Sequence, residues 1–310
     1  MSLTEFNAID RFWKRASRRP QTVLSIGDDG ALLANAPGQH WALTVDTLVA
    51  GVHFLPDTDA FDLGHKMLAV NLSDLAAMGA QPMAVTLALT LPKLDEAWLA
   101  RLAEGFWQLA ETFEIDLIGG DTTQGPLTAT LQAMGQVPAG QALTRRGAKP
   151  GDGIYVTGTL GDAGLGLNML LGKTALACPD AVLRHHRPTP RVHEGLALRG
   201  IANSCIDISD GLAQDLGHIL RHSGVGATLH EANLPLSPSV KHYIQESGDW
   251  QLPLTAGEDY ELCCTLPPKL AQHLPNSFTC IGTIDTEPGL RIQRGTAIVP
   301  LSPQGYQHFS

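Results

Sequence analysis

The chain has 310 residues, of which 44% are hydrophobic and 17% charged, as is typical of a globular protein of about two domains. Its net charge of −10, with no basic tract to offset it, argues against a nucleic-acid partner. We find no signal-peptide core and no apolar run near the ~20 residues of a membrane helix, so we expect a cytoplasmic protein without a membrane partner.

The first half of the chain alternates strand and helix signals. Alternating or continuous apolar residues predict strands over 42–49, 84–92, 115–118 and 128–137. Helical spacing of apolar residues predicts helices over 62–79 and 95–114. This order predicts a mixed α/β domain.

Residues 138–150 change character and indicate a domain boundary. The segment PAGQALTRRGAKP is rich in Pro and Gly and lacks periodicity, so we expect domains over 1–138 and 149–310. The second half repeats the mixed style, with strands predicted over 153–157, 261–266 and 278–284, and helices over 162–172, 191–202 and 211–222. Surface loops are predicted over 174–190 and 232–239.

Carboxylates recur in short turns beside glycine, often where an apolar run ends. The turns are IGDDGALL, TVDTLVAG, NLSDLAAMGA, IGGDTTQG, DISDG and GEDYEL. Each carboxylate alone is more typical of a turn or a helix cap than of a metal site. Six acidic turns of one style instead favour binding of hard cations and of the phosphates that such cations carry. Nine of their carboxylates nearly equal the net charge of −10, so the acidity is local; they are Asp28, Asp29, Asp46, Asp74, Asp121, Asp207, Asp210, Glu258 and Asp259.

Two further segments bear on phosphate binding. The segment LGKT at 171–174 is not a Walker A loop, because Leu167 stands where the first glycine is required. The turn GTLGDAGLG at 158–166 follows a strand and precedes a helix, where N–H groups could hold a phosphate. A plain strand-to-helix turn is an equally good interpretation of that segment.

The acidic turns predict a type of chemistry. No Ser-His-Asp or Cys-His arrangement can be argued from spacing, and a metal-rich site without an evident base favours phosphoryl transfer. A phosphomonoester has a second pKa of about 6, so as an acceptor it is already ionised at neutral pH and needs no base. It does need cations that let two anionic phosphates approach each other.

At these residues the sequence resembles the thiamine-monophosphate kinase family, within the superfamily that includes aminoimidazole ribonucleotide synthetase and selenophosphate synthetase. The resemblance is collinear over nearly the whole chain, through GDDGALL, TVDTLVAGVHF, KMLAVNLSDLAAMGAQP, LIGGDTTQGP, LTRRGAKPGD, DISDGLAQDLGHI and GEDYELC. It implies the two-domain α/β fold of that superfamily, with an N-terminal ATP- and Mg²⁺-binding domain that forms a shared sheet or barrel in a homodimer. A C-terminal α/β domain would cover the site.

The resemblance also implies a reaction and the residues that perform it. The γ-phosphate of ATP would pass directly to thiamine monophosphate, with several Mg²⁺ ions present and a monovalent cation left open. The implied Mg²⁺ ligands are Asp29, Thr44, Asp46, Asp74, Asp121, Asp207 and Asp210, with a backbone carbonyl at Val45. Within this set, the implied catalytic residues are Asp46, Asp74, Asp121 and Asp207. The implied nucleotide contacts are Gly120, Asp121, Arg145 and Ser209, and the implied thiamine contacts are His53, Glu258 and Tyr306.

Alternatives remain at this stage. A lone histidine near an apolar run, such as His53, is usually structural, and Asp210 is equally typical of a helix N-cap. Selenophosphate synthetase relatives usually use a cysteine or selenocysteine near the N-terminus, whereas no cysteine precedes Cys178 here. A non-catalytic metal- or nucleotide-binding protein is the alternative from a different functional class.

Overall fold

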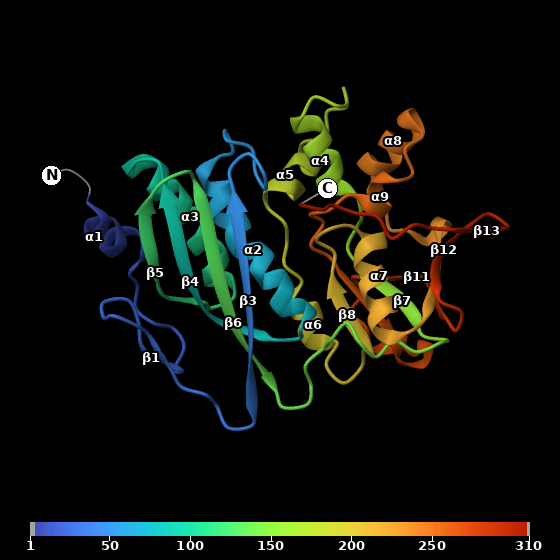
Figure 1. Ribbon diagram of the computed structural model, residues 1–310, viewed down its shortest axis with the longest axis horizontal. Helices are drawn as coiled ribbons and strands as arrows, with labels where there is room; N and C mark the ends of the chain where they lie inside the picture. Colours follow the sequence, from blue (N-terminus) through green and yellow to red (C-terminus); the bar gives the residue numbers. More distant parts are fainter. Residues whose placement is uncertain (1–3, 309–310) are drawn as a thin grey trace. The chain divides into compact units, whose positions relative to one another are not determined.

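The computed structural model describes residues 4–308, which form two compact units (Figure 1). The first unit contains the chain up to Leu75 together with Ala80–Gly140, and the second contains Ala76–Gly79 together with the chain from Gln141 on. Both units combine helices with sheets, which confirms the mixed α/β class. Among the described residues no helix is both long and apolar enough to cross a membrane.

The N-terminal unit is built on a four-stranded sheet. Its strands lie in the order β3 (Gln39–Val49), β6 (Thr128–Pro138), β4 (Gln81–Leu91) and β5 (Asp116–Gln124). β6 is antiparallel to both of its neighbours, whereas β4 and β5 are parallel. The unit also contains α1 (Glu5–Ala8), a π-helical turn (Ile9–Trp13), and the short strands β1 (Thr22–Leu24) and β2 (Leu32–Leu33).

Two helices, α2 (Ala60–Ala77) and α3 (Glu96–Thr112), cover one face of this sheet (Figure 1). They approach each other closely at two glycines. A Cβ atom on Gly64 would lie 2.0 Å from the carbonyl oxygen of Leu102, and one on Gly105 would lie 2.0 Å from that of Phe61. The small residues therefore set how closely the two helices pack.

We expect the substitution Gly105→Ala to destabilise the protein, because the new methyl group would overlap the backbone of α2. Overpacking of this kind costs about 1–3 kcal/mol, and here the helices must move apart to relieve it. Urea denaturation would measure the loss. Gly30→Ala is the control, since a Cβ at Gly30 meets no atom within 4 Å. Equal stability of the two variants would contradict this account of the packing.

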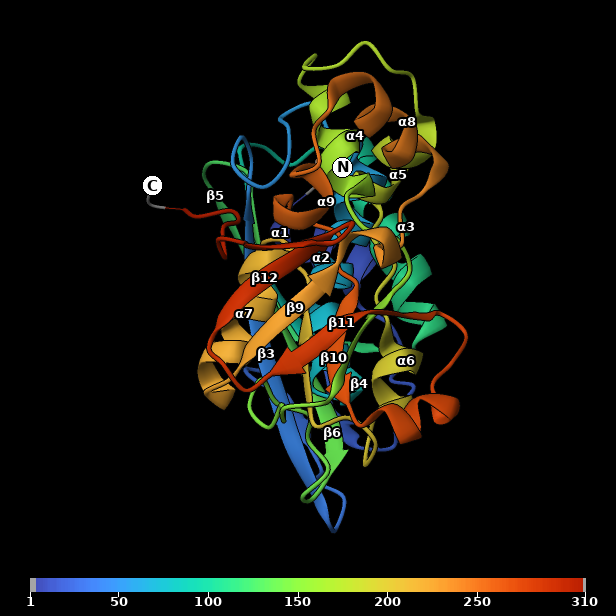
Figure 2. The ribbon, with the colours of Figure 1, turned by 90° about the vertical axis from the view of Figure 1, so that its right-hand side faces the viewer.

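The C-terminal unit is built on a seven-stranded sheet. Its strands lie in the order β13 (Ala297–Pro300), β12 (Gly289–Arg294), β9 (Gly226–His230), β11 (Phe278–Asp285), β7 (Gly153–Thr157), β10 (Leu262–Leu266) and β8 (Ser204–Asp207). All pairs are antiparallel except β12 with β9. Figure 2 shows β12, β9 and β11 side by side.

The helices of this unit are α4 (Asp162–Leu170), α5 (Pro179–His186), α6 (Val192–Ala197), α7 (Leu212–Ser223), α8 (Pro238–Ser247) and α9 (Leu252–Thr255). α7 packs its apolar side into the core, where Leu212, Leu216 and Ile219 are at most 1% exposed. This confirms the helix predicted over 211–222.

Three sequence-based expectations about elements are wrong. The predicted loop over 174–190 contains α5, whose buried side is small and consists of Ala181 and His185. The helix predicted over 191–202 is only α6, because the chain turns at Gly200, where φ is +70°. Finally, β5 continues through the segment GGDTT, so Asp121 lies within a strand and not in a turn after it.

Candidate functional site

Two of the acidic segments line one cavity of about 630 Å³ in the N-terminal unit. One wall holds Asp28 and Asp29 of the DDG turn together with the Gly119–Thr122 part of β5. Another wall is apolar and includes Phe6, whose exposed fraction of 74% is unusual for so large a hydrophobic residue. The cavity therefore combines exposed carboxylates with an apolar surface.

Gly120 is the residue that shapes the β5 side of this cavity. Its φ is +154°, and a Cβ atom there would lie 1.9 Å from the carbonyl oxygen of Leu87 in β4. No other residue fits this position without moving the strand, so the backbone beside Asp121 is bare toward the cavity. The predicted pair of Gly120 and Asp121 is thus brought together with Asp29.

A second acidic group in the same unit joins β3 to α2. Thr44 and Asp46 are two residues apart and share a side of β3, and the Thr44 hydroxyl donates a hydrogen bond to Asp74 Oδ2 of α2. Burial, and secondarily the charge of Asp74, raises the pKa of Asp46 to about 7. Two carboxylates held in this way repel each other, and a hard cation would relieve the repulsion.

Val45 and His53 differ from the rest of the predicted set. The Val45 side chain is 59% exposed on the opposite side of β3 from Asp46, so only its backbone could act as a ligand. His53 follows β3 in a turn, where its Nδ1 accepts a hydrogen bond from the N–H of Val49 at 3.0 Å. This contact supports a structural role for that ring nitrogen.

The acidic residues of the N-terminal unit do not all lie together. Asp46 lies on β3 and Asp121 on β5, the two outer strands of a four-stranded sheet, so three strand spacings of ~4.8 Å separate them by about 14 Å. Asp46 pairs with Leu131 of β6, whereas Asp121 pairs with Ala88 of β4, which in turn pairs with Thr130 of β6. Because Thr130 and Leu131 are adjacent in one strand, the side chains of Asp121 and Asp46 point to opposite faces of the sheet. Over residues 4–308, no three His, Cys, Asp or Glu side chains are grouped to hold a metal ion.

The C-terminal unit brings the DISDG turn, the GEDYEL segment and the chain end together. The N–H of Glu258 donates to the carbonyl of Ser209 at 2.8 Å, and the N–H of Tyr306 donates to that of Asp210 at 3.0 Å. Gln214 of α7 donates both to Asp210 Oδ2 at 2.9 Å and to the carbonyl of Tyr306 at 3.1 Å. Four of the predicted residues in this half of the chain are therefore neighbours.

Asp207 and Arg145 complete the predicted set in this unit. Asp207 ends β8 and is 4% exposed, in register with Leu262 of β10. Arg145 is exposed in the segment before β7. Burial, followed by the charges of Arg145 and Arg221, lowers the pKa of His218, while the charge of Asp210 raises it.

Asp215 is a residue that sequence reasoning missed. Its Oδ2 accepts hydrogen bonds from the N–H groups of Ser209, Asp210 and Gly211, at 3.1, 3.0 and 3.0 Å. The carboxylate thus holds the whole turn that carries Ser209 and Asp210. Its position one turn into α7 was the available signal, because a carboxylate there can reach back to N–H groups before the helix.

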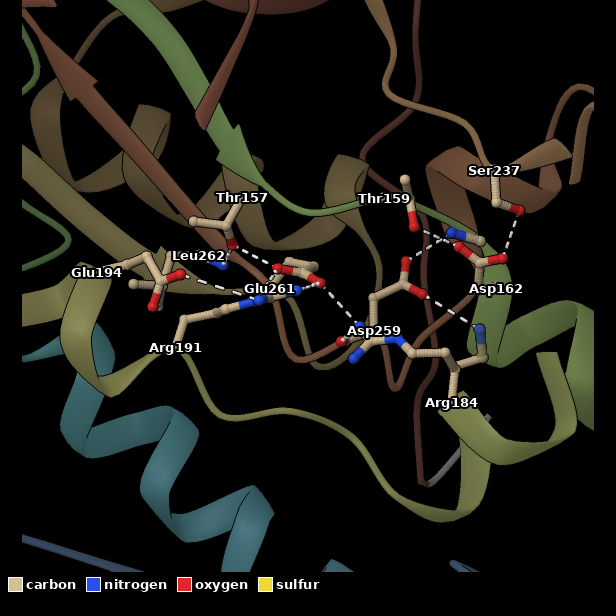
Figure 3. A network of polar contacts seen from close by, with 12 residues as sticks. Thr157, Thr159, Asp162, Arg184, Arg191, Glu194, Ser237, Asp259, Glu261 and Leu262 are labelled. Carbon is tan, nitrogen blue, oxygen red and sulfur yellow. Dashed lines mark hydrogen bonds and ion pairs between the residues drawn. The ribbon is translucent and has the colours of Figure 1, made fainter. Parts of the chain in front are cut away.

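A buried polar network fixes the GEDYEL segment (Figure 3). Glu261 is 0% exposed and receives two hydrogen bonds of 2.6 Å from Arg191, one of 2.8 Å from Arg184 and one of 2.5 Å from the Thr157 hydroxyl. Asp259, 1% exposed, accepts from the N–H of Gly161 at 2.8 Å. A carboxylate buried this deeply is stable only with such partners.

The same network decides between the two interpretations of the GTLGDAGLG turn. Asp259 accepts hydrogen bonds from the N–H groups of Gly161 and Ala163, the N–H groups that a bound phosphate would need. Asp162 accepts from the hydroxyls of Thr159 and Ser237, at 2.6 and 2.5 Å. The protein itself therefore supplies the anion at the start of α4, and the turn is structural.

Burial is the main cause that raises the pKa of Asp259 to about 7. Because this folded-state pKa is above the value of 3.8 in the unfolded chain, the group favours folding at low pH and loses that contribution as the pH rises toward 7. We expect wild-type stability relative to Asp259→Asn to fall by about 2 kcal/mol between pH 5 and pH 8. Urea denaturation at each pH would measure it. The exposed Asp180→Asn variant should show no such trend, and a flat difference for Asp259→Asn would refute the assignment.

Comparison with known proteins gives consistent results. Residues 27–137 match the AIR synthase related protein, N-terminal domain, and residues 149–285 match the AIR synthase related protein, C-terminal domain. The chain is 49% identical to thiamine-monophosphate kinase of Escherichia coli (strain K12) over 324 residues, which cover 100% of this chain and 99% of that protein.

Solved structures agree with the sequence matches. Thiamine-monophosphate kinase from Stenotrophomonas maltophilia K279a superposes with a TM-score of 0.82 at 44% identity, covering 90% of this chain and 93% of that chain. A structure described as AaThiL complexed with AMPPCP and TMP gives a TM-score of 0.80 at 31% identity and covers 92% of each chain.

Proposed function

The chain belongs to the thiamine-monophosphate kinases of the AIR synthase-related family, and we propose that it transfers the γ-phosphate of ATP to thiamine monophosphate. The products are ADP and thiamine diphosphate, so the protein is a transferase of thiamine diphosphate biosynthesis. The observation that carries this function is 49% identity to a thiamine-monophosphate kinase across the full chain. ATP and thiamine monophosphate are the two substrates of this reaction. We propose that the reaction takes place in the cytoplasm.

We propose that the nucleotide binds in the cavity between the DDG turn and β5. A volume of about 630 Å³ suits a ligand of this size, and the apolar wall around Phe6 and Trp13 offers a surface on which an adenine ring can pack. The phosphates would then face Asp29, Gly120 and Asp121, where the bare backbone permits close approach. Carboxylates repel phosphates directly, so this arrangement requires cations between them.

Magnesium is the cation that this donor set fits. The candidate ligands are carboxylate and hydroxyl oxygens, which Mg²⁺ prefers, and the paired carboxylates Asp46 and Asp74 with the Thr44 hydroxyl are suited to hold one ion. When bound, Mg²⁺ neutralises phosphate charge and orients the reacting groups. We propose that Asp29 and Asp121 hold further ions in the N-terminal unit, and that Asp207 and Asp210 do so in the C-terminal unit.

We propose that the remaining predicted residues act as substrate contacts. Arg145 and Ser209 would contact the nucleotide, while Glu258, Tyr306 and His53 would contact thiamine monophosphate. Glu258 and Tyr306 are both tied by backbone hydrogen bonds to the DISDG turn, and Tyr306 also lines a cavity of about 370 Å³.

The domain over 1–138 is proposed to mediate a homodimer as well as to bind Mg²⁺ and ATP. Two observations support this. The exposed face of the sheet carries Leu43 and Val45, at 60% and 59% exposure, which is unfavourable in water. In addition, Asp46 and Asp121 lie on opposite outer strands, so a second copy could bring β5 of one chain near β3 of the other.

A mixing experiment tests whether two copies share a site. The variants Asp46→Asn and Asp121→Asn should each be inactive alone. If each site takes Asp46 from one copy and Asp121 from the other, random heterodimers would restore about a quarter of wild-type activity. Unfolding and refolding the mixed variants, followed by an activity assay, measures this. No recovery, although heterodimers form, would show that each copy holds a complete site.

The experiment that tests the function itself is an assay of ADP release with purified protein. ADP should appear only when ATP, Mg²⁺ and thiamine monophosphate are all present. A panel of other phosphomonoesters, including aminoimidazole ribonucleotide precursors and nucleoside monophosphates, serves as the control. Tight binding of ATP without ADP release for any acceptor would instead favour a non-catalytic nucleotide-binding protein.

A further inference from the structure

Helix α5 presents two neighbouring side chains to the GEDYEL segment. His185 is 3% exposed, and its Nδ1 lies 2.9 Å from Glu258 Oε2. Within the described part of the chain this buried nitrogen forms no hydrogen bond of good geometry, so the contact with Glu258 is the close polar contact that it has. Burial of a ring nitrogen costs free energy unless the nitrogen is paired, which indicates that His185 interacts with the Glu258 carboxylate beside it.

Arg184, the residue before His185, holds the backbone of the GEDYEL segment. Arg184 Nη2 donates to the carbonyl oxygen of Asp259 at 2.9 Å and to Glu261 Oε1 at 2.8 Å. This one turn of α5 therefore contacts all three acidic residues of the segment, Glu258, Asp259 and Glu261. In Figure 3, Arg184 lies beside Asp259 and points toward Glu261.

The backbone of the segment is strained, and its neighbours maintain the strain. Glu258 and Tyr260 have φ values of +70° and +49°, in the left-handed region that residues with a side chain avoid. Such conformations cost about 1–3 kcal/mol each and persist only where surrounding contacts impose them. Here the contacts are the hydrogen bonds of the segment to Ser209 and Ile208 and those of Arg184. Strain of this kind fixes the direction in which the Glu258 side chain leaves the backbone.

We propose that His185 is a positioning residue for substrate recognition, which orients the Glu258 carboxylate toward thiamine monophosphate. The proposal rests on the function proposed above, in which Glu258 contacts the thiamine part of the substrate. The 2.9 Å approach of Nδ1 to Oε2 pairs the ring with the carboxylate, which presents acceptor oxygens to a cationic thiazolium or an amino group. The buried ring has little freedom, so it limits the rotation of the carboxylate that it contacts.

Two substitutions at His185 separate this role from packing. His185→Phe keeps a ring of similar size and removes the donor, whereas His185→Asn places an amide nitrogen close to the position of Nδ1. We expect His185→Phe to raise the KM for thiamine monophosphate about tenfold with the KM for ATP unchanged, because the contact involves a charged group. His185→Asn should return the KM to within about threefold of wild type. His242→Phe, on the exposed side of α8, is the matched control and should change neither KM.

A double-mutant cycle with Glu258→Gln completes the test. If His185 acts through Glu258, adding His185→Phe to Glu258→Gln should change the KM for thiamine monophosphate by less than about twofold. Equal effects of His185→Phe in both backgrounds would overturn the proposal, as would an unchanged KM in His185→Phe when Glu258→Gln raises it. If Glu258→Gln itself leaves that KM unchanged, the thiamine contact is wrong and the proposal falls with it. Should His185→Phe not fold, His185→Leu, which also lacks a donor, is judged by the same criteria.

Discussion

Replacing Asp121 with asparagine is expected to lower kcat by about 10²–10³-fold, because the loss of one ligand charge weakens the binding of the cations that neutralise the phosphates. Asp121 is exposed at the cavity wall beside Gly120, so the amide creates no buried void and breaks no core contact. The fold should therefore survive, and thermal denaturation should show a melting temperature close to that of the wild type. Steady-state assays of ADP release at saturating substrates would measure kcat.

The control for this substitution is Asp57→Asn. Asp57 is also an exposed aspartate of the N-terminal unit, in the loop between β3 and α2, and the same chemical change there should leave kcat within about twofold. Raising the Mg²⁺ concentration should recover part of the activity of Asp121→Asn, since the defect is one of cation binding. Wild-type kcat in Asp121→Asn, or full activity of the native protein in excess chelator, would remove Asp121 from the proposed metal site.

Thiamine without its phosphate is expected to be a poor acceptor, with kcat/KM lower than that for thiamine monophosphate by a factor of about 10³ or more. The free alcohol must lose a proton when it attacks, and the N-terminal acidic groups are proposed to hold cations and so are not available as bases. A phosphate oxygen is already ionised at neutral pH and needs no such group. In addition, thiamine carries no phosphate, so cations that bridge two phosphates would have no group to bind on this acceptor.

Parallel assays with the two acceptors at several concentrations would measure this ratio. Thiamine should also inhibit the reaction with thiamine monophosphate only weakly, because it lacks the group through which the cations would hold it. Similar kcat/KM values for both acceptors would contradict direct transfer from phosphate to phosphate. A base would then have to be sought among the carboxylates, and Asp46, whose pKa burial raises to about 7, would be the first to test.

Much of the chemistry was predictable because it depends on local residue types. Carboxylates beside glycine predict hard cations, the lack of an evident base predicts a phosphate acceptor, and the motifs from GDDGALL to GEDYELC identify the family. The family and the activity are confirmed by the comparisons. The long helices over 62–79 and 95–114 could also be predicted from the sequence, since a sustained apolar stripe is a strong local signal.

Short or polar elements could not be predicted from local sequence patterns in this way. Helix α5 was predicted as a loop because its buried side consists of Ala181 and His185, which carry no periodic apolar signal. Its importance comes from contacts with a segment more than 70 residues away, such as that of Arg184 with Glu261. Asp259 likewise could not be recognised as an anchor, because its partners are backbone N–H groups, which every residue type except proline supplies.

The amino-acid sequence by itself determined which ligands this protein can attract, since charge, glycine content and motif spacing are properties of short segments. Only the tertiary structure decided which of those segments meet. It placed Asp29 and Asp121 on one cavity, Thr44 beside Asp74, and Glu258 beside His185, and it put Asp46 and Asp121 on opposite outer strands. Strand order and helix packing depend on burial of apolar surface between distant parts of the chain, which no local pattern specifies.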